Sequence, residues 1–224
     1  DFVANVSPEL RTPLTVIVGY LETLQDSDEP INPRWKRALQ QMEQQSRRMQ
    51  NLLNDLLMLA RLENDDRTVE HKPVDIGQML NSVAQDGRAL SADQGHQIRL
   101  ETDPKIRLLG ADAELSSAFS NLVFNAVKYT PDRGEISICS WRDQGGVHIS
   151  VSDNGTGIAP QHISRLTERF YRVDSSRSTN TGGTGLGLAI VKHVLLRHEG
   201  RLEISSTLGK GSVFTCHFPI SRSA

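Results

Sequence analysis

The chain has 224 residues, of which 37% are hydrophobic and 23% charged, enough for one medium domain or two small ones. Its formal net charge of −2 argues against nucleic-acid binding, because neutralising phosphates takes a clustered basic surface that this sequence lacks. No apolar run reaches the length of a membrane span, and Cys139 and Cys216 show no metal-ligand spacing. A reduced, cytosolic compartment is therefore expected.

The first predicted element is a helix with one apolar stripe, formed by Val3, Val6, Leu10, Pro13, Ile17, Tyr20 and Leu24. Position 8 lies on the opposite face, where Glu9 and Thr12 flank it. This position is Pro8, and a proline inside a helix lacks the N–H donor and destabilises the helix by about 3 kcal/mol. The sequence predicts a kink or break near Ser7; alternatively, Ser7 caps a helix that starts at Pro8.

A second helix is predicted over 34–63, after a loop at 26–33 that contains two prolines. Its apolar stripe comprises Trp35, Leu39, Met42, Ser46, Met49, Leu53, Leu56 and Ala60. A lone helical hairpin buries little apolar surface, so we expect two hairpins to form a four-helix bundle in a homodimer. The alternative is that the stripes pack only against the C-terminal part of the same chain.

The rest of the chain, after a polar hinge at 64–68, alternates strand and helix patterns. Strands are predicted at 69–74, 97–102, 107–109, 135–141, 147–152, 202–206 and 212–218, and helices at 76–94, 112–129 and 185–198. This pattern predicts an α+β protein in which a helical hairpin precedes a two-layer α/β sandwich. The expected domains are a hairpin at 1–64, a linker at 65–75 and an α/β domain at 76–224.

Polar side chains recur on one face of the predicted helix 112–129. Asn121, Asn125 and Lys128 follow one another at four- and three-residue spacing, so they project from the same side. An amide oxygen suits Mg²⁺, and a lysine neutralises phosphate oxygens. Taken alone, such a face is more often a solvated surface.

Two glycine-rich stretches follow in the sequence. The segment 153–158 begins with Asp153 directly after a strand, where a carboxylate can accept a hydrogen bond from the amino group of adenine, although many ordinary turns look similar. The segment 182–188 leads into a helix, whose N-terminus and glycine amides suit a polyphosphate. It matches neither a Walker loop nor a dinucleotide fingerprint. The small polar residues at 175–181 predict a mobile lid.

Together these motifs resemble those of sensor histidine kinases. Residues 7–14 match the phospho-acceptor box in seven of eight positions, and Pro8 stands where the family has its phosphorylated histidine. The stretches around Asn125, 153–158, 168–172 and 182–188 resemble the asparagine, first-glycine, phenylalanine and second-glycine boxes of the ATP-binding domain, a fold shared with DNA gyrase, a class of heat-shock chaperones and mismatch-repair ATPases. The amino-acid sequences of the first box and of 121–131 are most similar to those of phosphate-regulon sensor kinases.

The resemblance implies a role for individual residues. Asp153 would hold adenine, Asn125 the Mg²⁺, Lys128 and Tyr129 the phosphates or ribose, and Arg172 the γ-phosphate. Glu9 would be the general base, helped by Asn121, and Thr12 would orient water for dephosphorylating the response regulator. The remaining nucleotide-binding positions are expected at Gly155, Gly157, Ile158, Phe170, Tyr171, Gly183, Thr184, Gly185, Leu186, Gly187 and Leu188.

The same resemblance implies ATP and Mg²⁺ as cofactors and a response-regulator receiver domain as partner. ATPases of this fold carry a water-activating glutamate at the position of Asn121, so its absence favours phosphoryl transfer over hydrolysis. With Pro8 in place there is a donor site and no acceptor, and we expect a kinase core that cannot autophosphorylate. The alternatives are a non-catalytic or phosphatase-only nucleotide-binding dimer. The chain is expected to be the cytoplasmic fragment of a bacterial protein anchored in the inner membrane through a missing N-terminal region.

Overall fold

The computed structural model describes residues 13–20, 33–64, 71–173 and 183–223. Several predicted features lie outside these ranges: the kink near Ser7, the side chains of Pro8, Glu9 and Thr12, most of the loop 26–33 and of the hinge 64–68, and the lid 175–181. No helix in the described ranges combines the length and the hydropathy that crossing a bilayer requires.

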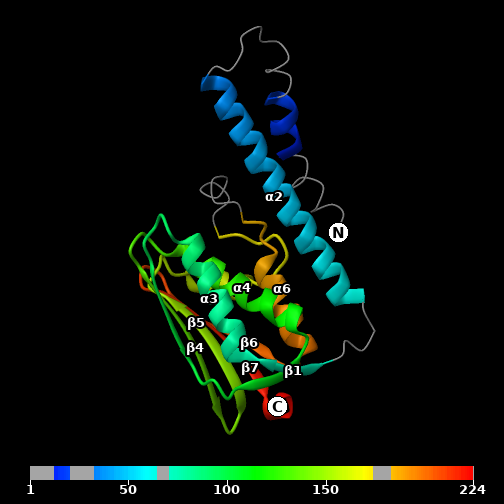
Figure 1. Ribbon diagram of the computed structural model, residues 1–224, viewed down its shortest axis with the longest axis vertical. Helices are drawn as coiled ribbons and strands as arrows, with labels where there is room; N and C mark the ends of the chain where they lie inside the picture. The colour runs from blue at the N-terminus through cyan, green and yellow to red at the C-terminus, as the bar shows by residue number, and fades with distance from the viewer. Residues whose placement is uncertain (1–12, 21–32, 65–70, 174–182, 224) are drawn as a thin grey trace.

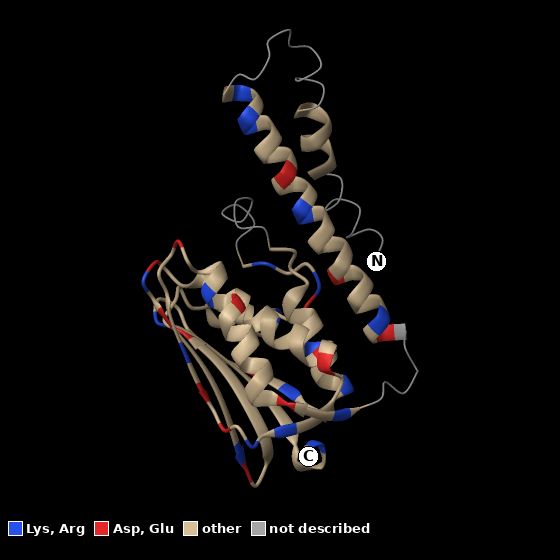
Figure 2. Ribbon diagram, viewed as in Figure 1, with Lys and Arg blue, Asp and Glu red and all other residues tan. Residues whose placement is uncertain are grey.

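The helical part of the chain consists of residues 13–20 and the long helix α2, Pro33–Asn64. In residues 13–20, Pro13 is buried while Leu14 and Val18 are exposed, as the predicted stripe requires. Figure 1 shows the N-terminal half of α2 extending beyond the α/β domain and its C-terminal half lying against it. The N-terminal end of α2 carries basic residues only, and basic and acidic residues alternate further along the helix (Figure 2).

The buried face of α2 is not the stripe predicted from the sequence. Met42 and Leu56 are buried as expected, but Leu39 and Leu53 are 56% and 47% exposed in the single chain. Burial instead follows a neighbouring face of the helix: Ala38, Met42, Leu52, Leu56, Leu59 and Leu62. The difference arises because the C-terminal half of α2 packs on a helix of the α/β domain, α6 (Gly187–Arg197), which periodicity within α2 alone cannot reveal.

The α/β domain is a two-layer sandwich, as predicted. Its main sheet has the strand order β2-β4-β5-β7-β6, with β2 parallel to β4 and the other neighbours antiparallel. These strands are β2 Gln97–Thr102, β4 Glu135–Asp143, β5 Gly146–Asp153, β6 Arg201–Thr207 and β7 Gly211–Pro219. The predicted hairpin is confirmed: β4 and β5 pair in register from Asp143 with Gly146 back to Ile136 with Asp153.

A separate two-stranded sheet pairs β1 (Lys72–Asp75) with β3 (Arg107–Gly110). The segment 65–75, expected as a linker, therefore contains a strand of the α/β fold. Near the other end of the chain, a short helix, η1 (Ile220–Arg222), precedes Ser223, which forms an isolated bridge with Leu108 of β3. The first strand and the last residues of the domain thus meet at the same small sheet.

Helices cover one face of the main sheet (Figure 1): α3 (Ile76–Leu90), α4 (Asp112–Tyr129) and α6. The short helix α5 (Pro160–Ile163) follows β5. In α4 the buried side chains recur at helical spacing and include Phe119, which meets Phe218 of β7 edge to face at 6.4 Å. Fully burying an aliphatic or phenylalanine side chain stabilises the fold by about 1.5–3 kcal/mol, so this layer contributes much of the stability.

Local signals explain why these helices begin where they do. Asp75 caps α3, because its Oδ1 accepts a hydrogen bond from Gln78 N at 2.9 Å, an interaction worth roughly 1 kcal/mol. At the other end, α3 stops at Leu90, before the predicted limit of 94, and Gly95 takes a left-handed φ of 67° in the following turn. The predicted helix 185–198 starts only at Gly187, because Gly185 has a φ of 75°, which no α-helix accommodates.

Candidate nucleotide site

The candidate site is organised by α4, which spans the predicted residues. Its buried face holds Leu122 and Ala126, while Asn121, Asn125 and Lys128 lie on the opposite, partly exposed side. The amide nitrogen of Asn121 donates to Ser117 O at 3.0 Å, one turn back in the helix. This bond fixes the amide so that its oxygen lies on the side of the glycine-rich loop.

That loop, 183–187, lies directly against α4. A Cβ on Gly187 would overlap Asn121 Oδ1, and a Cβ on Gly183 would overlap Lys128 Nζ. Gly185 adopts a φ of 75° and its carbonyl accepts a hydrogen bond from Phe170 N at 2.9 Å. Glycine is required most clearly at Gly185, whose φ side chains rarely adopt. The structure thus brings the two predicted motifs together although about sixty residues of sequence separate them.

The glycine-rich loop leads into α6, whose first turn suits an anion. The N-cap position is Leu186, which forms no side-chain cap with the free N–H groups of that turn. Uncapped amides and the helix dipole together favour negative charge at such an end. The geometry is therefore compatible with a phosphate group placed between Lys128 and the start of α6.

Lys128 is the main charge of the site. Burial, together with the smaller effects of the nearby cations Arg172 and Arg48, lowers its pKa from 10.5 to about 8. Its ammonium also lies 5.0 Å from the centre of the Tyr129 ring. Half-buried positive charges that repel one another are stabilised by an anion, so this arrangement fits a polyphosphate. Arg48 belongs to α2, and no motif in the sequence indicated its presence here.

The predicted adenine end is built from the last residue of β5 and the turn after it. Asp153 Oδ1 accepts a hydrogen bond from Gly155 N at 2.8 Å, and burial raises the pKa of Asp153 against the effect of this bond. Thr156 N donates to Tyr129 O at 3.1 Å, and a Cβ on Gly155 would overlap the same carbonyl. The turn is thereby held against the C-terminal end of α4.

The rest of this turn is fixed by β6. Gly157 has a φ of 63°, and a Cβ there would overlap Thr207 O. Ile158 N donates to Ser206 Oγ at 2.8 Å, and the Ile158 side chain packs on the core. These contacts hold the backbone of the predicted first-glycine motif close to Asp153.

Residues 169–172 lie between the two glycine-rich motifs in the sequence and contact the second of them through Phe170. Phe170 has a φ of 62°, a strained conformation for an aromatic residue, and its N–H bond to Gly185 holds it there. The Tyr171 hydroxyl lies 2.6 Å from His162 Nδ1, and Arg165 stacks on its ring at 4.3 Å. Tyr171 is thus held by neighbours inside the domain, whereas Arg172 lies near Lys128.

The site is also joined to α2, which sequence reasoning missed. The Thr184 hydroxyl donates to Asp55 Oδ2 at 2.7 Å and accepts from Leu186 N at 3.2 Å. Burial raises the pKa of Asp55, and the Thr184 bond opposes that rise. Two turns further along α2, Glu63 forms an ion pair with Arg169, and its Oε1 lies 3.3 Å from His193 Nε2. Burial and the nearby Arg169 and Lys192 lower the pKa of His193.

Leu59, which is fully buried, lies between these two polar contacts of α2. No sequence signal marked Asp55 or Glu63, because each lies among ordinary charged and amide residues of a helix. Of the predicted site residues, the structure brings together those of α4, 153–158, 169–172 and 183–188. It does not describe the predicted acceptor region, which includes Pro8, Glu9 and Thr12.

Two family models match the chain. Residues 1–65 match the His Kinase A (phospho-acceptor) domain, and residues 110–222 match the histidine kinase-, DNA gyrase B- and HSP90-like ATPase. The chain is 67% identical over 218 residues to the phosphate regulon sensor protein PhoR of Pseudomonas aeruginosa, covering 97% of this chain and 49% of that protein. It is 45% identical to the protein of the same name from Haemophilus influenzae, covering 97% and 51% of the two chains.

Among solved structures, full-length ShkA in complex with AMPPNP is similar over 99% of this chain and 46% of that one, with a TM-score of 0.73 and 29% identity. The chain spans about half the length of the two curated relatives. Its similarity to them extends over both the helical part and the α/β domain.

Proposed function

The chain belongs to the sensor histidine kinases, and on that premise we propose that it is a transmitter core that binds Mg-ATP in the site around α4. The observation that carries this proposal is the convergence of Lys128, Asn121 and the glycine-rich loop, with the uncapped start of α6 beside them. The three positive side chains of Lys128, Arg172 and Arg48 and the uncapped amides at the start of α6 fit a triphosphate.

Different residues of the site would bind different parts of the nucleotide. Asp153 would accept a hydrogen bond from the adenine amino group, and Lys128 and Arg172 would neutralise phosphate oxygens. Asn125 offers an amide oxygen that would hold Mg²⁺, an ion that offsets phosphate charge. Asn121 carries an amide where a water-activating carboxylate would be needed for hydrolysis, so the site suits transfer to a presented side chain.

We further propose that this chain does not autophosphorylate, because Pro8 occupies the acceptor position. A proline side chain has no nitrogen that can receive a phosphoryl group, whereas the expected acceptor is an imidazole. In a form with histidine at position 8, Glu9 would act as general base and Asn121 would help to orient it. The phosphoryl group would then pass to an aspartate of a response regulator.

A homodimer through the hairpin is the proposed assembly. Leu39, Leu53 and Leu57 of α2 are about half exposed in the single chain, as are Leu14 and Val18 of residues 13–20. Leu39 and Leu53 belong to the stripe whose spacing predicts a helical bundle. Packing within the chain buries Met42 and Leu56 of this stripe but leaves Leu39 and Leu53 available for a second copy of the chain.

A second candidate function is a non-catalytic or phosphatase-only dimer that engages a response regulator. The Asp55–Thr184 hydrogen bond favours it, because it joins the glycine-rich loop to the hairpin and could report nucleotide occupancy without phosphoryl transfer. In the phosphatase form of this proposal, Thr12 orients the attacking water. Anchoring of the whole protein in the inner membrane is likewise a proposal.

The deciding experiment compares this chain with its Pro8→His variant. Calorimetry measures Mg-ATP binding by each, and transfer of label from [γ-³²P]ATP measures autophosphorylation. We expect both to bind and only the variant to be labelled. Absence of binding in both would refute the nucleotide site, and labelling of the unchanged chain would refute the role of Pro8.

A phosphorylated receiver domain separates the two candidate functions. Faster loss of phosphate from the receiver in the presence of the unchanged chain, abolished by Thr12→Ala, would support the phosphatase-only form. Binding of the receiver without dephosphorylation would support a non-catalytic module.

A further inference from the structure

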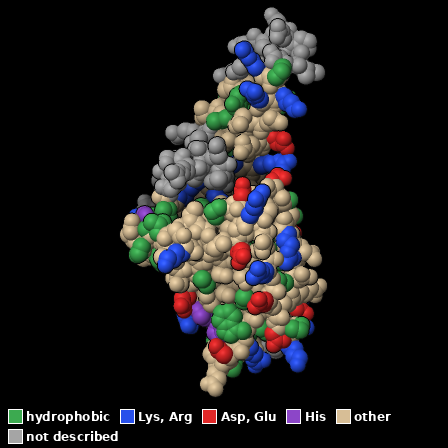
Figure 3. Space-filling model, turned by 90° about the vertical axis from the view of Figure 1, so that its left-hand side faces the viewer, with side chains coloured by type: hydrophobic (Ala, Val, Ile, Leu, Met, Phe, Trp, Pro, Cys, Tyr) green, Lys and Arg blue, Asp and Glu red, His purple; other side chains and the backbone are tan. Residues whose placement is uncertain are grey.

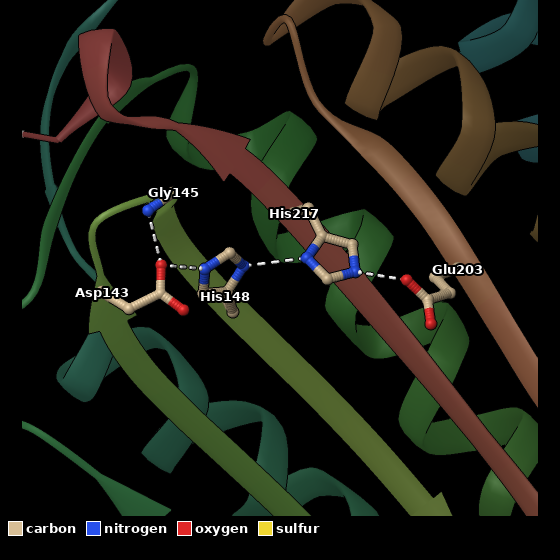
Figure 4. Close-up of polar contacts among 5 residues, drawn as sticks. All are labelled: Asp143, Gly145, His148, Glu203 and His217. Carbon is tan, nitrogen blue, oxygen red and sulfur yellow. Dashed lines mark hydrogen bonds and ion pairs between the residues drawn. The ribbon is translucent and has the colours of Figure 1, made fainter.

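Two histidines face each other across neighbouring strands of the main sheet. His148 of β5 is the direct partner of His217 of β7, and their Nδ1 atoms are 2.8 Å apart (Figure 4). On the far side of each ring, His148 Nε2 lies 2.9 Å from Asp143 Oδ1 and His217 Nε2 lies 3.1 Å from Glu203 Oε2. We call these four residues the Asp–His–His–Glu chain; it joins β4, β5, β7 and β6.

The Asp–His–His–Glu chain lies on the face of the sheet that the helices leave open, away from the nucleotide site. Figure 3 shows this side of the molecule, where charged side chains of both signs are scattered and single hydrophobic side chains lie between them. His148 is nevertheless only 7% exposed, because the Trp141 ring lies over it at 5.2 Å and His217 adjoins it at 4.9 Å. Arg201 of β6, the strand partner of His217, is a further charged neighbour.

The number of protons on the nitrogen atoms of the two imidazole rings follows from their hydrogen-bond contacts. An ionised carboxylate only accepts hydrogen bonds, so both Nε2 atoms must carry a proton. The 2.8 Å contact between the two Nδ1 atoms is a hydrogen bond only if one of them also carries a proton. Three protons on two imidazole rings make one of the rings an imidazolium cation.

The surroundings indicate which ring carries the charge. The hydrogen bond from His148 is the main reason why the pKa of Asp143 lies below its ordinary value. Burial lowers the pKa of His217, and the positive charges of Arg201 and His148 lower it further, against the opposing effect of Glu203. His217 is therefore the neutral ring, which donates from Nε2 to Glu203 and accepts at Nδ1. The hydrogen-bond count then places the third proton on His148, which donates to Asp143 and to His217.

We propose that the Asp–His–His–Glu chain is a binding site for a single proton, which cross-links the side chains of β4, β5, β7 and β6 only while it is present. This inference does not depend on the proposed nucleotide chemistry, because His148 lies near the start of β5 and Asp153 at its end.

The proposal predicts that the contribution of these four residues to stability passes through a maximum as the pH changes. On the acid side, unfolded histidines take up protons near pH 6.5 whereas folded His217 resists its second proton, so the folded state loses stability as the pH falls. A second proton would also set two N–H groups against each other. On the alkaline side, loss of the shared proton leaves two lone pairs facing each other and removes the central hydrogen bond.

A metal ion between the two Nδ1 atoms is the competing occupant, since carboxylates behind metal-bound histidines are common. Distance argues for the proton. Two imidazole nitrogens bound to tetrahedral Zn²⁺ would lie about 3.3 Å apart, whereas 2.8 Å is the length of an N–H···N hydrogen bond.

Imidazole ¹⁵N NMR of the whole ¹⁵N-labelled chain, treated with EDTA, provides the direct test between pH 5 and 9. We expect His148 to show two protonated nitrogens and His217 a single proton at Nε2, and both rings to change together when the shared proton leaves. Two neutral rings that titrate independently would overturn the proposal. So would stoichiometric binding of added Zn²⁺ that shifts both Nδ1 signals at neutral pH.

The His217→Gln variant gives a second test that does not rely on assignment of the spectra. Glutamine can accept from His148 and donate to Glu203 but cannot take up a proton, so the acid limb of the Tm profile should flatten. His148→Gln should flatten the alkaline limb and lower the maximum by about 3 °C. If both variants keep the Tm profile of the unchanged protein, the Asp–His–His–Glu chain is not the origin of the pH dependence of stability and the proposal fails.

Discussion

Raising the pH from 7 to 9 should weaken nucleotide binding about tenfold through Lys128. The pKa of this lysine in the folded chain without nucleotide is about 8, so its ammonium is largely charged at pH 7 and largely neutral at pH 9. A bound polyphosphate stabilises the charged form and restores a pKa near the ordinary value of about 10.4. The apparent Kd then rises by about a factor of ten between these two pH values, because the free protein must first take up a proton.

The sign of the stability effect is opposite in the absence of nucleotide. Because the folded pKa of Lys128 is depressed, the unfolded chain binds more protons than the folded chain between about pH 8 and 10. Removing protons therefore favours the folded state, and Lys128 should make the chain more stable as the pH rises through this window. Nucleotide should reduce this gain.

Calorimetry with Mg-ADP at pH 7, 8 and 9 tests the argument. Titrations at pH 8 in two buffers of different ionisation enthalpy should reveal uptake of about half a proton per nucleotide bound. Adenosine, which lacks phosphates, should bind with a pH-independent affinity through the Asp153 end of the site. Lys128→Arg keeps a positive charge throughout and should show a flat Kd.

Two results would refute this reasoning. An unchanged wild-type Kd between pH 7 and 9 would mean that Lys128 does not meet the phosphates or that its pKa is not depressed. A tenfold loss that persists in Lys128→Arg would assign the titration to another group.

Three further predictions concern packing around the site. Thr184→Val should lower the free energy of unfolding by about 1–3 kcal/mol, and a double-mutant cycle with Asp55→Asn in denaturant melts should give a coupling of about 1 kcal/mol; zero coupling would argue against the bond. Gly187→Ala should weaken Mg-ADP binding at least about tenfold, because its Cβ forces the loop away from α4; unaltered affinity in calorimetry would contradict the close approach. Leu59→Ala should destabilise the chain by about 2–5 kcal/mol, whereas Leu196→Ala, at an exposed position, should stay within about 0.5 kcal/mol; equal effects would mean that α2 does not pack on α6 in solution.

Much of the α/β domain could be predicted because its information is local. The helix Asp112–Tyr129 and the strand Gln97–Thr102 have the predicted bounds, since their apolar residues recur with one clear period and breakers flank them. The clustering of Asn121 and Lys128 on one face also follows from spacing alone. These features need no knowledge of distant residues.

The contacts between distant residues could not be predicted in this way. Asp55 and Thr184 are 129 residues apart, and His148 and His217 are 69 apart. Each looks ordinary in its own segment, and only the register of the sheet and the packing of α2 on α6 bring the partners together. The same reason explains Leu39 and Leu53: periodicity identifies an apolar stripe but does not say which neighbour covers it.

The hydroxyl of Thr184 has one proton to donate, and that proton is already directed at α2. If the glycine-rich loop changes its conformation when a ligand binds, the Thr184–Asp55 bond changes with it, so ligand binding is coupled to the docking of α2. This coupling acts equally in both directions. The ratio of nucleotide affinities with α2 docked and undocked must equal the ratio of docking constants with nucleotide bound and absent. The α/β domain without its hairpin would accordingly bind nucleotide with the undocked affinity. The nucleotide affinity of the whole chain would differ from this value to the extent that nucleotide changes the free energy of the Thr184–Asp55 contact and of the contacts around it.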